Sequence, residues 1–285
     1  MRINVSLENY YGIGDLVCLS WIAEATRGTP DPISFYAPRG VRYTVLELFG
    51  QPVSDDATKA GTCIYQAYQN ELQDGGRRRR LDYFCDRLGI QTAFRRPKLV
   101  ASADDMQWAK QIRQEIGGQH LVLLFPQTHW IPRDWPACYW VDLAWMLHER
   151  QIQTVMFLAH EDAQFTNTPR FYWGFPLPKI AALMSFSDLA IGVDSGPVHL
   201  SATIGTPTIV LTGPTRPECV FGHMPEVVAL TSRDAPGCAG CHFRAPFRPA
   251  CDQGCQSLYS LTPSTVTARI VAELARPGRP TPVAH

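Results

Sequence analysis

Hydrophobic and polar positions change period along the chain, and the periods predict its elements. Ile3, Val5 and Leu7 alternate with polar residues, which predicts a strand. The apolar stretch 16–25, behind a glycine-rich turn, predicts a helix, so the chain begins like a β-α-β unit. Further elements of the first half are predicted as strands at 33–36 and 63–67 and helices at 41–49 and 81–88.

The same pattern starts again after residue 117. Segment 103–116 has helical spacing and ends in two glycines, which stop a helix. The continuous apolar run Leu121 to Phe125 is typical of a parallel strand covered on both faces. The following elements are predicted as helices at 139–150, 180–186 and 198–204 and strands at 154–158, 189–193 and 208–211. We therefore expect an α/β protein with two doubly wound domains, 1–117 and 118–285.

The composition agrees with an ordinary globular protein. The chain has 285 residues, of which 45% are hydrophobic and 18% charged. Its 26 basic and 26 acidic side chains give zero formal net charge, so no general basic field attracts nucleic acid or anionic membranes. The apolar runs are shorter than the roughly 18 residues of a membrane span, and the first residues lack a secretory-leader pattern. We expect a cytoplasmic protein without a membrane span or a nucleic-acid partner.

One stretch near residue 194 carries the clearest chemical signal. Asp194, Ser195 and Gly196 follow a predicted strand and come directly before a predicted helix. Pro197 suits the first helical position, because its missing N–H would be unpaired there. The helix N-terminus offers free N–H groups and a positive dipole end, and Gly196 lets an anion approach the backbone. A phosphate or diphosphate site and a simple helix cap explain this geometry equally well.

Segment 193–215, which reads Val-Asp-Ser-Gly-Pro-Val-His and ends in Gly-Pro-Thr, resembles the signature of the ADP-heptose heptosyltransferase family. This family includes lipopolysaccharide-core and autotransporter glycosyltransferases. Gly-Ile-Gly-Asp at 12–15 resembles the family's N-terminal Gly-x-Gly-Asp loop, and 125–136 resembles its Thr…Lys-x-Trp-Pro loop. Thr212 stands where the family usually has Phe. The resemblance implies a GT-B architecture of two Rossmann-like domains, with the donor bound mostly by the C-terminal domain and the acceptor entering against the N-terminal one.

The resemblance also implies an activity. It indicates inverting, metal-independent transfer of a sugar, foremost a heptose, from a nucleotide-sugar donor such as ADP-heptose to a hydroxyl group. The sequence contains no Asp-x-Asp triplet, the cation-binding element of metal-dependent transferases. The expected acceptors are a glycan, a lipid-linked glycan such as a lipopolysaccharide core, or a protein. The alternative from another class is a non-catalytic nucleotide-binding or scaffold protein of a glycosylation assembly.

Five residues acquire expected roles from this resemblance. Asp15 would be the general base for the acceptor hydroxyl, although a turn aspartate that caps the next helix explains its position too. Arg133, where the family usually has Lys, would neutralise the leaving diphosphate, and Thr128 would donate a hydrogen bond to it. Glu161 would lie near the ribose or base of the donor, or in a solvated loop. For His199, a phosphate contact and a packed core position are equally good interpretations.

A second signal is a cysteine cluster within 236–256, formed by Cys238, Cys241, Cys251 and Cys255. Two close cysteine pairs can present four thiolates tetrahedrally, which suits structural zinc or a rubredoxin-like iron. The surrounding segment is rich in Gly and Pro and packs poorly on hydrophobic contacts alone, so a metal would stabilise it. Free or disulfide-linked cysteines are the alternative. The cluster also resembles autotransporter heptosyltransferases, in which a cysteine cluster binds iron, and its spacing does not choose between the two metals.

One charged run also stands out, the four consecutive arginines 77–80. A run of like charge is most simply solvated, so we expect an exposed loop or the start of a helix. Contact with a phosphorylated acceptor or a protein partner is the functional alternative.

Overall fold

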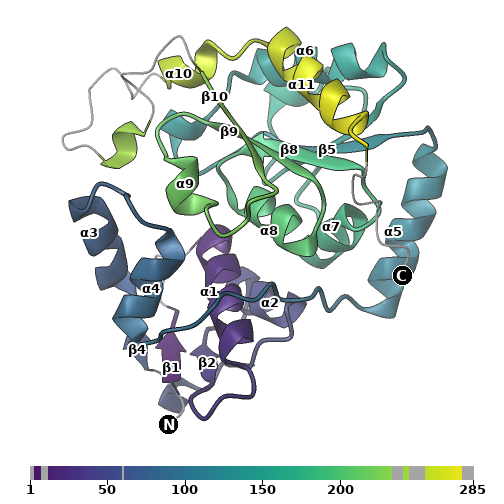
Figure 1. Ribbon diagram of the computed structural model, residues 1–285. Helices are drawn as coiled ribbons and strands as arrows, with labels where there is room; N and C mark the ends of the chain where they lie inside the picture. The colour runs from purple at the N-terminus through teal and green to yellow at the C-terminus, as the bar shows by residue number, and fades with distance from the viewer. Residues whose placement is uncertain (1–2, 8–11, 60, 233–239, 244–253, 278–285) are drawn as a thin grey trace.

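The computed structural model describes residues 3–7, 12–59, 61–232, 240–243 and 254–277. Within these ranges the strands form two separate sheets, one in each lobe of the molecule (Figure 1). The sheet of the first lobe has the spatial order β3 (Val53–Ser54), β2 (Ile33–Tyr36), β1 (Ile3–Ser6) and β4 (Thr62–Cys63). The sheet of the second lobe has the order β10 (Val228–Thr231), β9 (Thr208–Thr212), β8 (Leu189–Val193), β5 (Leu121–Phe125), β6 (Gln153–Leu158) and β7 (Phe171–Trp173).

Helices connect the strands. The first lobe contains α1 (Ile13–Thr26), α2 (Val41–Leu48), α3 (Tyr65–Gln73) and α4 (Arg80–Leu88). The second contains α6 (Ala137–His148), α7 (Leu177–Met184), α8 (Gly196–Ile204), α9 (Pro217–Val220), α10 (Gln256–Tyr259) and α11 (Pro263–Leu274), and α5 (Ala103–Ile116) precedes it. The short 3-10 helices are η1 (Ala57–Lys59), η2 (Ile131–Arg133), η3 (Ala163–Phe165) and η4 (Cys241–Phe243).

Every strand pairing recorded in the two sheets is parallel, which confirms the expected α/β class. The predicted strand 63–67 is wrong in most of its length. Strand β4 ends at Cys63, and α3 begins at Tyr65. The apolar residues of this segment are therefore divided between a two-residue edge strand and a helix, because a local apolar run does not distinguish the two.

The second sheet is covered on both faces, as its apolar strands predict. In β5, Val122 and Leu124 belong to the hydrophobic cluster that includes the α6 and α11 side chains. Leu121, Leu123 and Phe125 belong to the other cluster, together with side chains of α7 and α8. Successive strand residues point to opposite faces, so a strand buried on both sides needs no polar positions.

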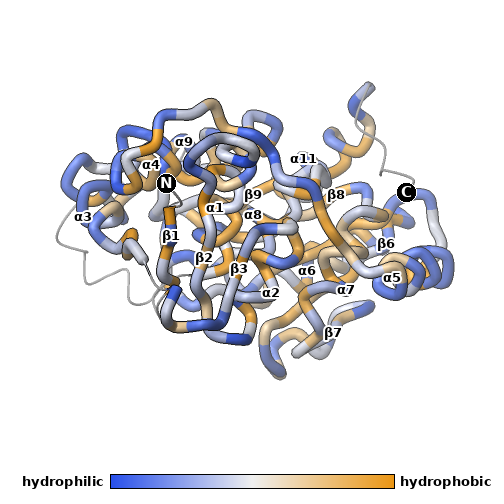
Figure 2. Tube along the Cα trace, turned by 90° about the horizontal axis from the view of Figure 1, so that it is seen from below, coloured by the Kyte–Doolittle hydropathy of each residue, from blue (hydrophilic) through white to orange (hydrophobic). Residues whose placement is uncertain are grey.

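The two lobes meet through α1 and α8, which lie against each other at the centre of Figure 1. The Trp21 indole donates a hydrogen bond to Thr203 Oγ1 at 2.9 Å across this junction. One hydrophobic cluster continues from the first sheet through both helices into the second lobe. Figure 2 shows hydrophobic segments gathered inside the molecule and hydrophilic ones along outer elements such as α3 and α5. The lobes are therefore joined by a shared core, which sets the relative positions of their loops.

Helix α5 packs against α7, although the predicted boundary at 117 assigns it to the first domain. The Trp108 and Phe175 rings lie 5.1 Å apart between their centroids, and the Lys179 ammonium lies 5.2 Å from the Trp108 ring. Among the residues that the structure describes, no helix is both long enough and apolar enough to cross a membrane.

Candidate active site

The carboxyl ends of the parallel strands in the second lobe bring together a buried ionic cluster around Asp194. Asp194 follows β8 and is only 3% exposed. Its Oδ2 lies 3.5 Å from Arg133 Nε, and its Oδ1 lies 3.3 Å from His199 Nε2. Burial would raise the pKa of Asp194, but the Arg133 charge and the His199 contact outweigh it and hold that pKa far below its ordinary value. Asp194 is thus an anion that anchors two candidate site residues.

His199 is a packed residue, one of the two interpretations left open by the sequence. It is 2% exposed, and its ring stacks on Phe221 with centroids 4.2 Å apart. Its bond to Asp194 fixes the ring in the first turns of α8. These contacts hold the Asp-Ser-Gly turn in place.

Arg133 and Thr128 come from the loop after β5. Arg133 Nη1 also donates to the Asp194 carbonyl oxygen at 3.3 Å, and its guanidinium lies 5.1 Å from the Trp130 ring. The Thr128 hydroxyl accepts a hydrogen bond from Trp130 N at 2.9 Å and lies 3.2 Å from Asp134 Oδ1. The structure thus places Arg133 beside Asp194, while the hydrogen bonds of the Thr128 hydroxyl stabilise its own loop.

The N-terminus of α8 has features of an anion site. Ser195 is the N-cap residue, yet its side chain makes no capping hydrogen bond. Its Oγ is buried and has no hydrogen-bond partner in the described part of the chain, and the same holds for Thr215 Oγ1 after the neighbouring strand β9. Buried hydroxyls without partners are uncommon in proteins. This edge of the sheet therefore has polar groups available for a polar ligand.

Asp15 lies in the first turn of α1, on the other lobe. Its Oδ2 accepts a hydrogen bond from Gly12 N at 3.0 Å, so it does cap the helix. A Cβ atom on Gly14 would lie 2.9 Å from His199 Cδ2, and one on Gly196 would lie 2.4 Å from Ile13 Cβ. The two glycine-containing turns, one from each lobe, are therefore in direct contact, and Asp15 lies at their meeting point.

Arg80 is the site-adjacent residue that the sequence pattern missed. It belongs to the arginine run expected to be solvated, but it is 7% exposed. Its guanidinium bonds Glu71 at 2.8 and 3.0 Å and approaches Asp15 Oδ1 at 3.4 Å. The expectation of an exposed run is wrong for this residue, because the opposite charge lies on the preceding helix α3. Its partner Glu71 lies nine positions earlier, but no sequence signal reveals that the two side chains are buried together.

Glu161 lies in the exposed turn after β6. The adjacent Asp162 caps η3 by accepting from Gln164 N at 3.0 Å. Gln127, for which the sequence predicts no role of its own, connects the ends of β5 and β6, since its Oε1 accepts from Ala159 N at 2.7 Å. Glu161 thus lies at the same sheet edge as Asp194, on the far side of β5.

The cysteine cluster is described only in part, because Cys238 and Cys251 lie outside the described residues. Cys241 begins η4, and Cys255 is 5% exposed at the N-cap of α10. Gly240 N donates to Gly213 O at 2.9 Å, and a Cβ on Gly213 would lie 2.6 Å from Cys255 Sγ. Both cysteine segments therefore adjoin Gly213. Within the described ranges no group of three or more His, Cys, Asp or Glu side chains is arranged to hold a metal.

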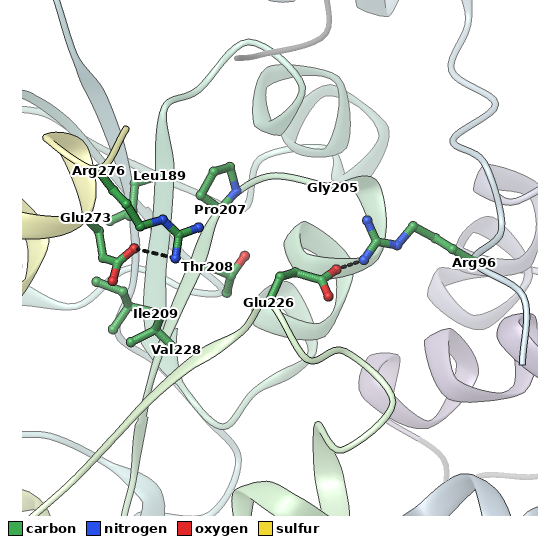
Figure 3. Close-up of a pocket in the computed structure, with 10 residues that line it drawn as sticks. All are labelled: Arg96, Leu189, Gly205, Pro207, Thr208, Ile209, Glu226, Val228, Glu273 and Arg276. Atoms are coloured by element: carbon green, nitrogen blue, oxygen red, sulfur yellow. Dashed lines mark ion pairs between the residues drawn. The ribbon is translucent and has the colours of Figure 1, made fainter. Parts of the chain in front are cut away.

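A cavity of about 310 Å³ lies at the opposite edge of the second sheet (Figure 3). The starts of β8, β9 and β10 form its floor, and two ion pairs flank it, Arg96 with Glu226 and Arg276 with Glu273. Ligands of open α/β sheets bind at the carboxyl ends of the strands. The candidate active site is therefore the Asp194 edge rather than this cavity.

The two lobes, each with its own parallel sheet, define a two-lobed α/β protein of the GT-B type. Residues 77–239 match glycosyltransferase family 9 (heptosyltransferase), and the chain belongs to this family.

Individual relatives agree with this assignment. Lipopolysaccharide heptosyltransferase 1 of Pseudomonas aeruginosa is 31% identical over 134 residues, which cover 44% of this chain and 37% of that protein. The alignments thus span little more than a third of the curated relatives. The iron-containing dodecameric glycosyltransferase TibC of enterotoxigenic Escherichia coli has a TM-score of 0.70 at 15% identity, covering 96% of this chain and 78% of TibC. E. coli heptosyltransferase WaaC with ADP has a TM-score of 0.58 at 13% identity, and the match covers 96% of this chain and 100% of WaaC. These structural matches establish the shared fold.

Proposed function

We propose that this protein is a cytoplasmic inverting glycosyltransferase that moves a sugar from a nucleotide-sugar donor to a hydroxyl group. Membership of the heptosyltransferase family supports a heptose as the sugar. The related fold of WaaC, solved with ADP, supports ADP-heptose as the donor. The proposed acceptors are a glycan, a lipid-linked glycan of the lipopolysaccharide-core type, or a protein.

The observation that carries this proposal is the contact between the Asp15 turn and the Asp-Ser-Gly turn. Sugar transfer needs a base for the acceptor and an anion site for the leaving diphosphate close together. The close approaches of Gly14 to His199 and of Gly196 to Ile13 supply that proximity. A protein that only bound nucleotide would not need a carboxylate from the other lobe at this point.

In the proposed reaction the acceptor oxygen bonds to the anomeric carbon while the bond from that carbon to the diphosphate breaks. The acceptor proton passes to the Asp15 carboxylate, and the nucleoside diphosphate leaves with its electron pair. Arg133 and the α8 N-terminus at Ser195 and Gly196 stabilise the departing charge. Asp194 and His199 hold this turn and Arg133 in place.

Two further residues are proposed to contact the nucleotide-sugar donor. Thr128 would turn its hydroxyl from its own loop toward a phosphate, and Glu161 would meet the ribose or base from the exposed turn after β6. Both residues lie at the carboxyl edge of the second sheet, the edge at which ligands of open α/β sheets bind, and this supports the two contacts.

The test compares two aspartates with the same local role. Asp82 caps α4 by accepting from Arg79 N, as Asp15 caps α1, but its carboxylate pairs with the Arg79 side chain and not with Arg80. We expect Asp15→Asn to lower kcat by about 100-fold or more, because general-base catalysis contributes on that scale, while Asp82→Asn retains it. Thermal shifts with ADP, UDP and GDP, measured on the wild type and both variants, identify the nucleotide.

The rival function is nucleotide binding without catalysis. It predicts a thermal shift with ADP or ADP-heptose and no turnover with any acceptor. Wild-type turnover by Asp15→Asn would instead refute the base assignment.

We also propose that Cys238, Cys241, Cys251 and Cys255 hold a structural zinc or iron ion. The convergence of the Cys241 and Cys255 segments on Gly213 supports this, as does the iron of the related fold TibC. Bound metal would cross-link the glycine-rich loop, and four thiolates would leave no open position for substrate. Elemental analysis of the purified protein identifies the metal, and Cys255→Ser should lose it. A metal content unchanged in Cys255→Ser would refute this ligand set.

A further inference from the structure

A buried ionic triad connects three elements of the first lobe beside the candidate base. Arg80 is the first residue of α4, Glu71 lies in α3 and Asp15 lies in α1. The Arg80 and Glu71 residues are 7% and 2% exposed, and the Asp15 side chain is 16% exposed. The neighbouring arginines of the run differ, since Arg78 and Arg79 pair with carboxylates nearer the surface.

The nitrogen atoms of the Arg80 guanidinium face two carboxylates, those of Glu71 and Asp15. Nε and Nη2 bond the two Glu71 oxygens at 3.0 and 2.8 Å, a bidentate pair. Nη1 is left to face Asp15 Oδ1 at 3.4 Å. Since Asp15 Oδ2 already accepts from Gly12 N, both oxygens of the Asp15 carboxylate are held in place.

Stability alone does not account for this triad. A buried ion pair often contributes no more stability than well-packed hydrophobic side chains of similar size. Burial opposes the charge of Arg80, yet Glu71 and Asp15 outweigh it and keep the pKa of Arg80 above its ordinary value. The triad therefore keeps a fixed cation beside Asp15.

We propose that Arg80 is a positioning residue for Asp15, and that Glu71 anchors Arg80 in this task. The inference rests on the proposed function, because it assigns Arg80 and Glu71 to the same base. Arg80 fixes the orientation of the carboxylate that takes up the acceptor proton. Because Glu71 holds Nε and Nη2, the guanidinium does not form a bidentate pair with Asp15. Such a pair would occupy the carboxylate oxygens that must take up the proton.

The test removes both charges of the anchoring pair at once. A single Arg80→Gln change leaves Glu71 buried without its partner and can unfold the protein. The double variant Glu71→Gln with Arg80→Gln leaves no unpaired charge between these two residues. We expect it to bind ADP like the wild type and to lose about 10- to 100-fold in kcat, because a base that is no longer held in place takes up the proton less efficiently.

Two further variants complete the experiment. Arg80→Lys keeps the buried charge but lacks the planar guanidinium that bonds two carboxylates at once, so it should fold, retain ADP binding and show a smaller loss of kcat than the double variant. The matched control, Arg78→Gln with Asp86→Asn, removes an exposed ion pair between the segment before α4 and α4 itself, and should retain kcat.

The outcomes separate this inference from the proposed function. If Asp15→Asn lowers kcat but the Glu71 and Arg80 double variant and Arg80→Lys keep wild-type kcat, Arg80 is structural and the inference is overturned. If Asp15→Asn itself keeps wild-type kcat, the base assignment fails and the inference fails with it.

Discussion

At the residue scale, the best-defined group is the Asp194 carboxylate. It is almost fully buried, and its two oxygens face different partners, Arg133 and His199. A buried carboxylate between such partners contributes to stability as well as to the shape of the site, because its charge is compensated on both sides. Its stabilising effect therefore depends on pH.

We expect Asp194→Asn to lower the free energy of unfolding at pH 7 by about 1.5–3 kcal/mol, the range for hydrogen bonds to charged groups. The folded-state pKa of Asp194 is lowered, so its contribution is present above its ordinary pKa near 3.8 and is lost as pH falls below that value. The difference between wild type and variant should thus shrink in acid. Urea unfolding at pH 7 and pH 3 measures it.

The control for this prediction is Asp55→Asn, which removes an exposed ion pair with Arg39. Such surface pairs contribute about 0–1 kcal/mol. Equal losses from Asp194→Asn and Asp55→Asn at pH 7 would contradict the role given to burial.

At the element scale, the decisive feature is the approach of the α1 and α8 N-termini. Gly196 has no left-handed backbone that would demand glycine. Glycine is required at this position because a larger residue would not fit: an added Cβ would lie 2.4 Å from Ile13 Cβ. The helices themselves were predicted from local periodicity, but their contact was not, because no local pattern encodes which helices meet.

Gly196→Ala should therefore push the two turns apart. We expect a loss of about 1–3 kcal/mol in the free energy of unfolding, the cost of overpacking a close contact, together with weaker ADP binding. Gly12→Ala is the matched control in the facing turn, because its Cβ would meet only Asp15 Oδ2, at an ordinary 3.6 Å. Chemical denaturation and nucleotide titration of both variants check this. A Gly196→Ala protein as stable as Gly12→Ala would show that the turns can separate freely.

At the scale of the whole molecule, the junction of the lobes contains a buried histidine. His223 is 7% exposed and meets the Trp21 ring edge-on with centroids 5.1 Å apart. Burial, reinforced by nearby His199 and arginines, lowers the pKa of His223 well below its ordinary 6.5. Burial likewise lowers the pKa of His242 to about 4. Both rings are neutral in the folded protein at pH 7.

This predicts that the joined lobes lose stability in mild acid. Below about pH 6.5 the unfolded chain binds a proton at each histidine while the folded protein does not, so the free energy of unfolding falls as pH falls, by up to about 1.4 kcal/mol per pH unit for each ring. His223→Phe keeps an aromatic ring beside Trp21 and should reduce this slope between pH 6.5 and 5. The exposed His148→Phe should not. Equal slopes in the two variants would refute the assignment to His223.

Much of the fold was predictable because it depends on near neighbours in sequence. The strands β5 and β8 and the helix α5 were predicted with their observed bounds, since each is long, strongly periodic or ended by glycine. The two-residue strands β3 and β4 have too few residues for any period to be recognised. Elements were missed in the second lobe too, where β7, β10 and α11 had no predicted counterpart.

The sequence by itself determined the α/β class, the family resemblance and the placing of Asp194 at a strand end before a helix, because all three depend on the order and spacing of nearby residues. Only the tertiary structure decided that Arg80 is buried beside Asp15, 65 positions away, and that His199 packs against Phe221. Such contacts arise when elements distant in the chain share one core, and burial of a charge is decided by the partners that this core supplies.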